Sequence, residues 1–264
     1  MPLVVCATPI GNLEDVTLRV LAELRAADVV LCEDTRHTRG LLERHGVEAR
    51  LVSYHEHNEA ARTQEYLPRL AAGERIALVT DAGMPGISDP GARIVRAALE
   101  GGIAVTVLPG PSAVETALVA SGLAGGAFRF VGFLPRGAAA LSALWPSLET
   151  VTVAFESPQR LPATLASLAA FDPARQVAVC RELTKKFEEV VRGPARDVAS
   201  QFAEPPKGEI TLVVDGPGAP VVDDSAALAA VAELVGLGVP RKRAAEIVSS
   251  LTGVSRNALY RGSL

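Results

Sequence analysis

The segment Thr80-Asp81-Ala82-Gly83-Met84-Pro85-Gly86-Ile87-Ser88-Asp89-Pro90-Gly91 decides how the rest of the chain is interpreted. It follows the apolar run 76–79, which is typical of a buried parallel strand, and precedes the helical pattern of residues 92–99. Strand-to-helix connections usually span about 2 to 6 residues, so a connection of this length is unusual. Its glycines let a ligand approach the backbone, and its two aspartates can hold hydroxyl or amino groups. The segment predicts one wall of a ligand site, with an ordinary turn as the alternative.

The first 108 residues alternate short apolar runs with amphipathic stretches, which predicts βαβ units and a mainly parallel sheet. The predicted strands are residues 3–7, 29–32, 50–54, 75–79 and 104–108. In such sheets, ligands bind beyond the carboxyl ends of the strands. Polar or Gly/Pro-rich segments follow all five strands, so we expect these segments to share one rim and to form the site.

A second alternating set of strands and helices follows the stiff segment Pro109-Gly110-Pro111. Its predicted strands are residues 128–134, 151–155, 177–181, 188–192 and 209–214. These strands lie closer together in the sequence, which predicts a mixed sheet. A linker near residues 217–225 then leads to three short helices. The predicted fold class is therefore α/β, with two α/β domains (1–110 and 111–216) around a cleft and a C-terminal helical module (222–264).

The charge distribution indicates a local basic surface. The whole chain carries a formal net charge of −4, which excludes a globally basic nucleic-acid binder. From residue 241 onward, five basic residues accompany a single acidic residue, so this stretch carries +4. The C-terminal module is therefore expected either to contact phosphate groups or to have solvated helix ends of no further role.

Cysteine and histidine usage predicts neither a disulfide framework nor a metal site. Cys6, Cys32 and Cys180 are far apart and lie in apolar runs, as expected for buried thiols in a reducing cytoplasm. His55 and His57 could share one face of a strand, but no cysteine is near, so polar rim residues are the preferred interpretation. No apolar run is long enough to span a bilayer, and the first residues predict a strand and no secretion signal. We expect a cytoplasmic protein without membrane contact.

Three common site motifs are absent: the Gly-x-Gly-x-x-Gly dinucleotide motif, the P-loop and the Gly-x-Ser-x-Gly elbow. Seven other segments occur in order instead: 8–13, 33–36, 80–91, 108–113, 155–158, 181–185 and 207–209. Over nearly the whole chain, these segments resemble the tetrapyrrole methylase superfamily. Within that superfamily, they resemble the enzymes that methylate the 2′-hydroxyl of a cytidine in 16S rRNA.

The resemblance implies S-adenosylmethionine (SAM) as cofactor, folded into the cleft between the two domains. The residues at matching cofactor positions are Ile10, Gly83, Met84, Pro85, Ile87, Ser112, Ala113, Phe155, Leu183, Ile210 and Thr211. Met84 and Gly86 stand where the family commonly has Thr and Leu, so side-chain contacts differ there while backbone contacts are expected to persist. The resemblance also implies a homodimer and a substrate in the 30S ribosomal subunit.

Asp81 and Glu182 are the candidates for a general base or an orienting group, because a ribose hydroxyl is a poor nucleophile near neutral pH. The alternatives are a loop-stabilising hydrogen bond for Asp81 and an ion pair with Arg181 or Lys185 for Glu182. The predicted RNA contacts are basic residues at two strand tips and in the tail: Arg36, His37, Arg39, Lys185, Lys186, Arg241, Lys242 and Arg243.

Two other functions are compatible with these motifs. A methylase acting on a small tetrapyrrole would share the cleft, but Glu33-Asp34-Thr35-Arg36 and the basic tail argue against it. A non-catalytic RNA-binding assembly factor would have lost SAM, and the intact glycines and Ser112 argue against that.

Overall fold

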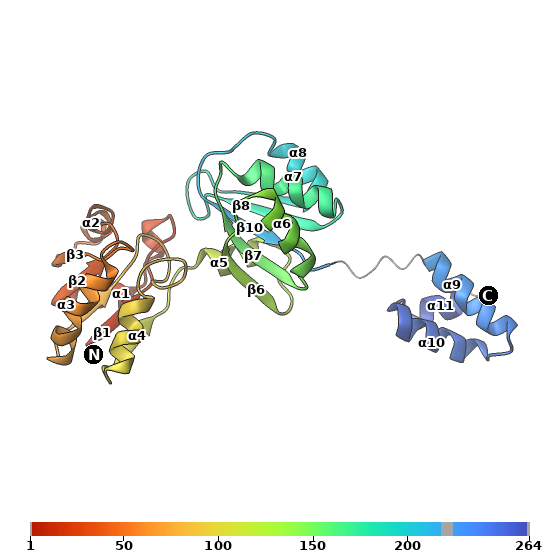
Figure 1. The fold of residues 1–264 in the computed structure, drawn as a ribbon, viewed down its shortest axis with the longest axis horizontal. Coiled ribbons are helices and arrows are strands. Elements are labelled where there is room, and N and C mark those ends of the chain that lie inside the picture. The colour runs from red at the N-terminus through yellow and green to blue at the C-terminus, as the bar shows by residue number, and fades with distance from the viewer. Residues whose placement is uncertain (1, 218–223, 263–264) are drawn as a thin grey trace. The chain divides into compact units, whose positions relative to one another are not determined.

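The computed structural model describes residues 2–217 and 224–262 (Figure 1). The chain forms two compact units, Met1–Asp215 and Gly216–Leu264. The first unit contains two five-stranded sheets, and the second contains three helices. Part of the predicted linker and both ends of the predicted C-terminal module lie outside the described residues. The predicted boundary between domains 1–110 and 111–216 lies within the first unit.

The first sheet is entirely parallel, as the sequence predicts. It consists of β1 (Leu3–Cys6), β2 (Val29–Cys32), β3 (Leu51–Ser53), β4 (Ile76–Leu78) and β5 (Val105–Leu108), in the order β3-β2-β4-β1-β5. Its connecting helices are α1 (Leu18–Ala26), α2 (Thr35–Arg44), α3 (Glu59–Ala71) and α4 (Ala92–Glu100), with the short 3-10 helix η1 (Leu13–Asp15). Strand β4 is central and fully buried, so the segment that follows it emerges from the middle of the sheet.

The helices of this half begin where the sequence supplies a cap. The Thr17 hydroxyl accepts a hydrogen bond from the Val20 amide at the start of α1, and the Asp34 carboxylate accepts one from the Arg36 amide at the start of α2. Apolar side chains of α1 and α2 pack on one face of the sheet, and those of α3 and α4 pack on the other. Both faces are therefore covered, as a parallel sheet requires.

The second sheet is mixed, as predicted. It consists of β6 (Phe128–Phe133), β7 (Val151–Glu156), β8 (Gln176–Arg181), β9 (Glu189–Pro194) and β10 (Ile210–Val214), in the order β6-β7-β10-β8-β9. Only β6 and β7 pair in parallel; the other three pairs are antiparallel. The accompanying helices are α5 (Ala113–Ser121), α6 (Ala138–Leu144), α7 (Leu161–Phe171) and α8 (Ala195–Gln201), with the 3-10 helix η2 (Trp145–Ser147).

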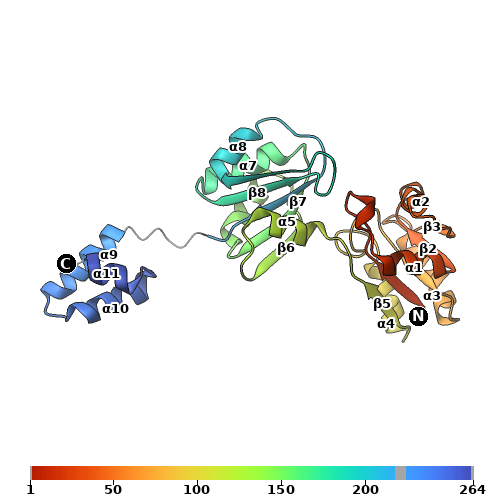
Figure 2. The ribbon, with the colours of Figure 1, turned by 180° about the vertical axis from the view of Figure 1, so that it is seen from behind.

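The helices of the second sheet are divided between its two faces. Helices α6, α7 and α8 cover one face and bury Trp145 among leucines, while α5 lies on the opposite face, as the two views show (Figures 1 and 2). Successive side chains of β10 contribute to the cores on the two faces of the sheet. Leu212 packs in the core under α6, α7 and α8, and Val213 packs in the core under α5. Helix α5 follows the hinge 109–111, so its N-terminus lies where the two sheets are connected.

The C-terminal unit consists of α9 (Asp224–Gly236), α10 (Arg241–Thr252) and α11 (Arg256–Gly262), which confirms the three predicted helices. Its own core contains Ala227, Val231, Ala244, Val248 and Leu259. Throughout residues 2–217 and 224–262, no helix combines the length and the apolar character needed to cross a bilayer.

Candidate active site

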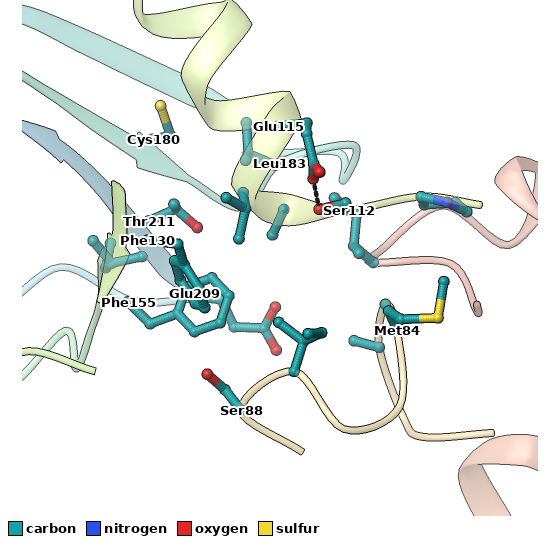
Figure 3. Close-up of a pocket in the computed structure, with 18 of the residues that line it drawn as sticks. Met84, Ser88, Ser112, Glu115, Phe130, Phe155, Cys180, Leu183, Glu209 and Thr211 are labelled. Carbon is teal, nitrogen blue, oxygen red and sulfur yellow. Dashed lines mark hydrogen bonds between the residues drawn. The ribbon is translucent and has the colours of Figure 1, made fainter. Parts of the chain in front are cut away.

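A cavity of about 910 Å³ lies in the first unit, beyond the carboxyl ends of the first sheet (Figure 3). The first half of the chain contributes Ile10 after β1, residues 82–84 and 87–89 of the β4–α4 loop, and the hinge 109–111. The second half contributes the first turn of α5, β6, the end of β7, and residues at the facing ends of β8 and β10. The segments after β1, β4 and β5 thus form one wall of the cavity, and the other wall belongs to the second sheet. The segments after β2 and β3, which were predicted to share this rim, do not line the cavity.

The β4–α4 loop is fixed to the segment after β1 by a short antiparallel bridge. The Thr8 amide donates to the Gly83 carbonyl at 2.9 Å, and the Gly83 amide donates to the Thr8 carbonyl at 3.1 Å. Gly83 has φ +79°, a conformation that favours glycine, and a Cβ atom there would lie 3.8 Å from Ile10 Cγ2. Both backbone groups of Gly83 are therefore bonded within the protein, which fixes the position of the loop.

The first turn of α5 presents free amides to the cavity. Ser112 occupies the N-cap position, but its hydroxyl makes no cap hydrogen bond and donates to the Glu115 carboxylate instead (Figure 3). Within the described part of the chain, no hydrogen bond engages the amides of residues 113–115. These amides carry the partial positive charge of a helix N-terminus, which suits a carboxylate.

An aromatic cluster forms the wall of the second sheet, and the sequence analysis missed most of it. The Phe155 ring meets the rings of Phe130 and Phe133 edge-on, at centroid distances of 5.0 and 5.5 Å. A bulge in β6 between Phe130 and Phe133 brings both onto one side of the strand, where regular alternation would separate them. The sequence contained one indication of this cluster, because three of the seven phenylalanines lie within residues 128–133.

Ten of the eleven residues predicted to bind the cofactor line this cavity. The exception is Pro85, which is buried beside Gly91 and lines a separate shallow depression against α4. The Met84 side chain packs partly against the core of the first sheet, so the larger residue is accommodated there. Figure 3 shows Met84 and Ser88 on the loop opposite Phe130 and Phe155, with the Glu209 carboxylate pointing into the space between.

Neither predicted catalytic residue, Asp81 or Glu182, is among the described residues that line the cavity. Asp81 Oδ1 accepts a hydrogen bond from the Asp34 amide at 3.1 Å, which ties the β4–α4 loop to the end of β2. Glu182 Oε1 accepts hydrogen bonds from the Glu209 amide and from Lys185 Nζ, both at 2.9 Å. These bonds hold the pKa of Glu182 below its usual range, which makes it a weak base. The alternative interpretations, loop stabilisation and an ion pair, are the ones observed.

The basic residues predicted to contact RNA differ in their exposure to solvent and in whether they form ion pairs. Arg39 and His37 are exposed at the start of α2, and Arg36 is exposed while it pairs with Asp34. Lys186 is exposed near the Phe187 ring. Lys185 is partly buried, and its ammonium group pairs with Glu182 and Glu209. The remaining three, Arg241, Lys242 and Arg243, form the first turn of α10 in the C-terminal unit.

Four acidic side chains line the cavity, and three of them have donors. Glu115 accepts from Ser112, Glu156 accepts from Thr164 and pairs with Arg160, and Glu209 pairs with Lys185. The fourth is Asp89, at the end of the β4–α4 loop. Burial raises its pKa to about 7, helped by the negative charges of Glu33 and Asp81.

The two sheets touch beside the cavity at Gly11. A Cβ atom on residue 11 would lie 2.5 Å from Lys185 Cγ and 2.9 Å from the Leu183 carbonyl oxygen, so only glycine allows this approach. The Asn12 amide donates to the Thr184 hydroxyl at 3.0 Å across the same contact. Glu182 and Thr184 both have positive φ, +51° and +64°, so the β8–β9 turn holds a strained backbone at this point.

The cysteines are free and buried, as predicted. Burial raises the pKa of Cys6 to about 12 and those of Cys32 and Cys180 to about 11, so the thiolate forms are suppressed. No group of three His, Cys, Asp or Glu side chains suited to a metal ion occurs in the part of the chain that the structure describes.

The sequence profile of the tetrapyrrole (corrin/porphyrin) methylases matches residues 2–199. Solved structures have the same fold: uroporphyrin-III-C-methyltransferase from Thermus thermophilus (TM-score 0.56, 23% identity) covers 81% of this chain and 93% of its own. A diphthine synthase (TM-score 0.61, 16% identity) covers 81% and 89%. The fold is thus that of a tetrapyrrole methylase.

Several relatives are much more similar in sequence, and all are named ribosomal RNA small subunit methyltransferase I. The protein from Mesorhizobium japonicum is 43% identical over 97% of this chain and 88% of its own length. That from Escherichia coli O157:H7 is 40% identical over 99% and 94%, and that from Thermotoga maritima is 44% identical over 81% and 98%. The chain belongs to the ribosomal RNA small subunit methyltransferase I family of the tetrapyrrole methylases.

Proposed function

We propose that this protein transfers a methyl group from SAM to the 2′-hydroxyl of a cytidine in 16S rRNA. The observation that carries the proposal is the cavity, which gathers ten of the eleven residues that the family resemblance assigns to SAM. Relatives of at least 40% identity carry the name of a small-subunit rRNA methyltransferase, which supports the choice of RNA as substrate.

The chemistry of the cavity fits SAM. Its volume of about 910 Å³ lies at the upper end of the range for small-molecule sites, leaving room for an acceptor group beside the cofactor. We propose that Leu183, Ile210 and Thr211 flank the adenine and that the amides at the start of α5 receive the carboxylate of the methionine part. The rings around Phe155 and the acidic side chains favour a cation, and the sulfonium of SAM is one.

SAM supplies an electrophilic methyl group on a positively charged sulfur. The protein has to hold the acceptor hydroxyl in line with that group and to keep water away. Orientation of this kind lowers a barrier by about 7 to 11 kcal/mol in ideal examples. The β4–α4 loop, which is bonded to Thr8 and Asp34, is a rigid support for such alignment.

The RNA contacts in the proposal are the exposed basic groups. Arg36, His37, Arg39 and Lys186 lie outside the cavity and would bind phosphate groups flanking the target nucleotide. The basic first turn of α10 would bind further phosphates of the same RNA. A cytidine stacked in a helix would have to leave the stack to reach the cavity. We propose the 30S subunit as the substrate, a homodimer as the active form and the cytoplasm as the location.

The test is transfer of label from tritiated SAM to 30S subunits from cells lacking the modification, followed by mass mapping of the RNA. We expect one labelled cytidine whose ribose carries the methyl group. Label on a base or on another RNA would contradict the assignment. Label in a tetrapyrrole, with none in 30S subunits, would favour the small-molecule alternative.

A further inference from the structure

Asp89 is distinguished from the other acids of the cavity by its lack of a donor. It lines the cavity and is half-buried at the end of the β4–α4 loop, next to Ser88, whose backbone has a positive φ of +62°. Among the hydrogen bonds and ion pairs of residues 2–217 and 224–262, none involves the Asp89 carboxylate. A residue that lines a cavity and whose carboxylate has no protein donor can offer that carboxylate to a ligand.

The charged groups around Asp89 are mostly acidic. Glu33, which follows β2, and Asp81, which lies on the same loop, both repel its negative charge. His55, which follows β3, interacts electrostatically with Glu33. Arg93 lies near Glu59, with Arg93 Nε 3.9 Å from Glu59 Oε2, and Glu59 accepts a hydrogen bond from the Gly91 amide. The surroundings therefore favour a proton on Asp89 more than on a solvent-exposed aspartate.

The three other acids of the cavity have partners within the protein. Arg160 and Lys185 neutralise Glu156 and Glu209, and a hydroxyl hydrogen bond stabilises the charge of Glu115. A general base works best when its pKa lies near the operating pH, and the pKa of Asp89 is raised to about 7. Strongly raised pKa values inside a cavity are also typical of functional carboxylates.

We propose that Asp89 is the general base that accepts the proton of the acceptor hydroxyl, an inference that rests on the proposed function. The hydroxyl oxygen forms its new bond to the methyl carbon as its proton passes to an Asp89 carboxylate oxygen. The electron pair of the broken carbon–sulfur bond stays on sulfur. Asp89 then releases its proton to the solvent in the open cavity.

The test combines a binding measurement, a rate and a titration on the full-length protein. Asp89→Asn keeps the size of the side chain and removes its basicity. We expect the single-turnover rate on unmethylated 30S subunits to fall by about 10²- to 10⁴-fold. We expect the affinity for S-adenosylhomocysteine, measured by calorimetry, to change less than about threefold, because the proposed role concerns the acceptor. Asp197→Asn, which makes the same change at an exposed aspartate of α8 that does not line the cavity, is the matched control and should leave the rate unchanged within about twofold.

The titration needs no turnover. In protein labelled with ¹³C at the aspartate carboxyl groups, one resonance should titrate near pH 7 and be missing from Asp89→Asn. Asp81→Asn removes a neighbouring negative charge, so this resonance should titrate at a lower pH. The acidic limb of the single-turnover rate should move with it. A role in folding alone would not link these two shifts.

The outcomes separate the two proposals. If wild-type protein binds S-adenosylhomocysteine but methylates no RNA, the proposed function fails. If wild-type protein is active and Asp89→Asn is equally active, the assignment of Asp89 fails alone. A variant that loses cofactor affinity as much as rate would make Asp89 a cofactor ligand and overturn the proposal, as would an Asp89 resonance that titrates near pH 4.

Discussion

The two walls of the cavity are built in different ways. The wall of the first sheet consists of loops after parallel strands, and its properties come from backbone conformation and carboxylates, as at Gly83 and Asp89. The wall of the second sheet consists largely of side chains on strands, led by the rings around Phe155. A substitution in the first wall should therefore act through geometry and charge, and one in the second wall through lost contact area.

Gly83→Val should have the largest effect. A branched side chain is strongly disfavoured at φ +79°, and forcing the loop away from Thr8 would displace every loop residue that lines the cavity. We expect the calorimetric affinity for S-adenosylhomocysteine to fall more than about 100-fold. Gly73→Val is the control, because Gly73 also has positive φ, +91°, but lies between α3 and β4, away from the cavity. Equal losses in both variants would mean a general effect on folding and would remove Gly83 from the site.

Phe155→Ala should weaken cofactor binding less. The change removes an aromatic ring from the wall of the cavity, and with it the area that this ring could offer to a ligand, but leaves the backbone of the cavity in place. We expect an affinity loss of roughly tenfold by the same calorimetry. Phe171→Ala, at the exposed end of α7, removes a ring of the same size outside the cavity. If the two variants bind S-adenosylhomocysteine equally well, the aromatic cluster does not contact the cofactor.

A variant of the C-terminal unit should leave both walls unaffected. Replacing Arg241, Lys242 and Arg243 by Ala should preserve affinity for S-adenosylhomocysteine and weaken binding to 30S subunits. Three lost phosphate contacts would reduce the slope of log affinity against log salt by about 2 to 3. Filter binding over a salt series measures that slope. An unchanged slope would mean that these three residues do not contact phosphate groups and are only solvated side chains at a helix end.

The smallest effect concerns stability and pH. The pKa of Asp89 is about 7 in the folded protein and 3.8 in its ordinary state, so the folded protein binds more protons between these values. Its free energy of unfolding should therefore fall as the pH rises through this window. After allowance for partial exposure, Asp89→Asn should be more stable than wild type at pH 8 by about 1 kcal/mol, with a smaller gain at pH 4. Urea unfolding at pH 8 and pH 4 measures the difference in the free energy of unfolding between Asp89→Asn and wild type. Equal differences at the two pH values would contradict the raised pKa of Asp89.

Much of this architecture could be predicted, because it depends on local pattern. Apolar runs and turn residues located all ten strands, and closer spacing distinguished the mixed sheet from the parallel one. The ion pair of Glu182 with Lys185 was a stated alternative, since the two residues are three positions apart. The strand orders were not predicted, because they depend on pairing between distant segments.

The features that the sequence left undetermined share a physical cause. Asp81 was a reasonable base on a ligand loop, but its carboxylate bonds the Asp34 amide, 47 residues away, and no local pattern shows that. The bulge that aligns Phe133 with Phe130 depends on pairing with β7. The difference between Asp81 and Asp89 follows from neighbours on other strands, so the sequence could name both aspartates but not distinguish them.

The contact at Gly11 has a consequence for the size of the cavity. The segment after β1 and the β8–β9 turn approach so closely there that a single methyl group would act as a wedge between them. The same contact contains the hydrogen bond from the Asn12 amide to the Thr184 hydroxyl and a turn with positive φ at Glu182 and Thr184, so the neighbouring atoms have little freedom to move away. The two segments can approach this closely because residue 11 has no side chain. The distance between the two walls depends on a missing side chain, at a residue that does not itself line the cavity.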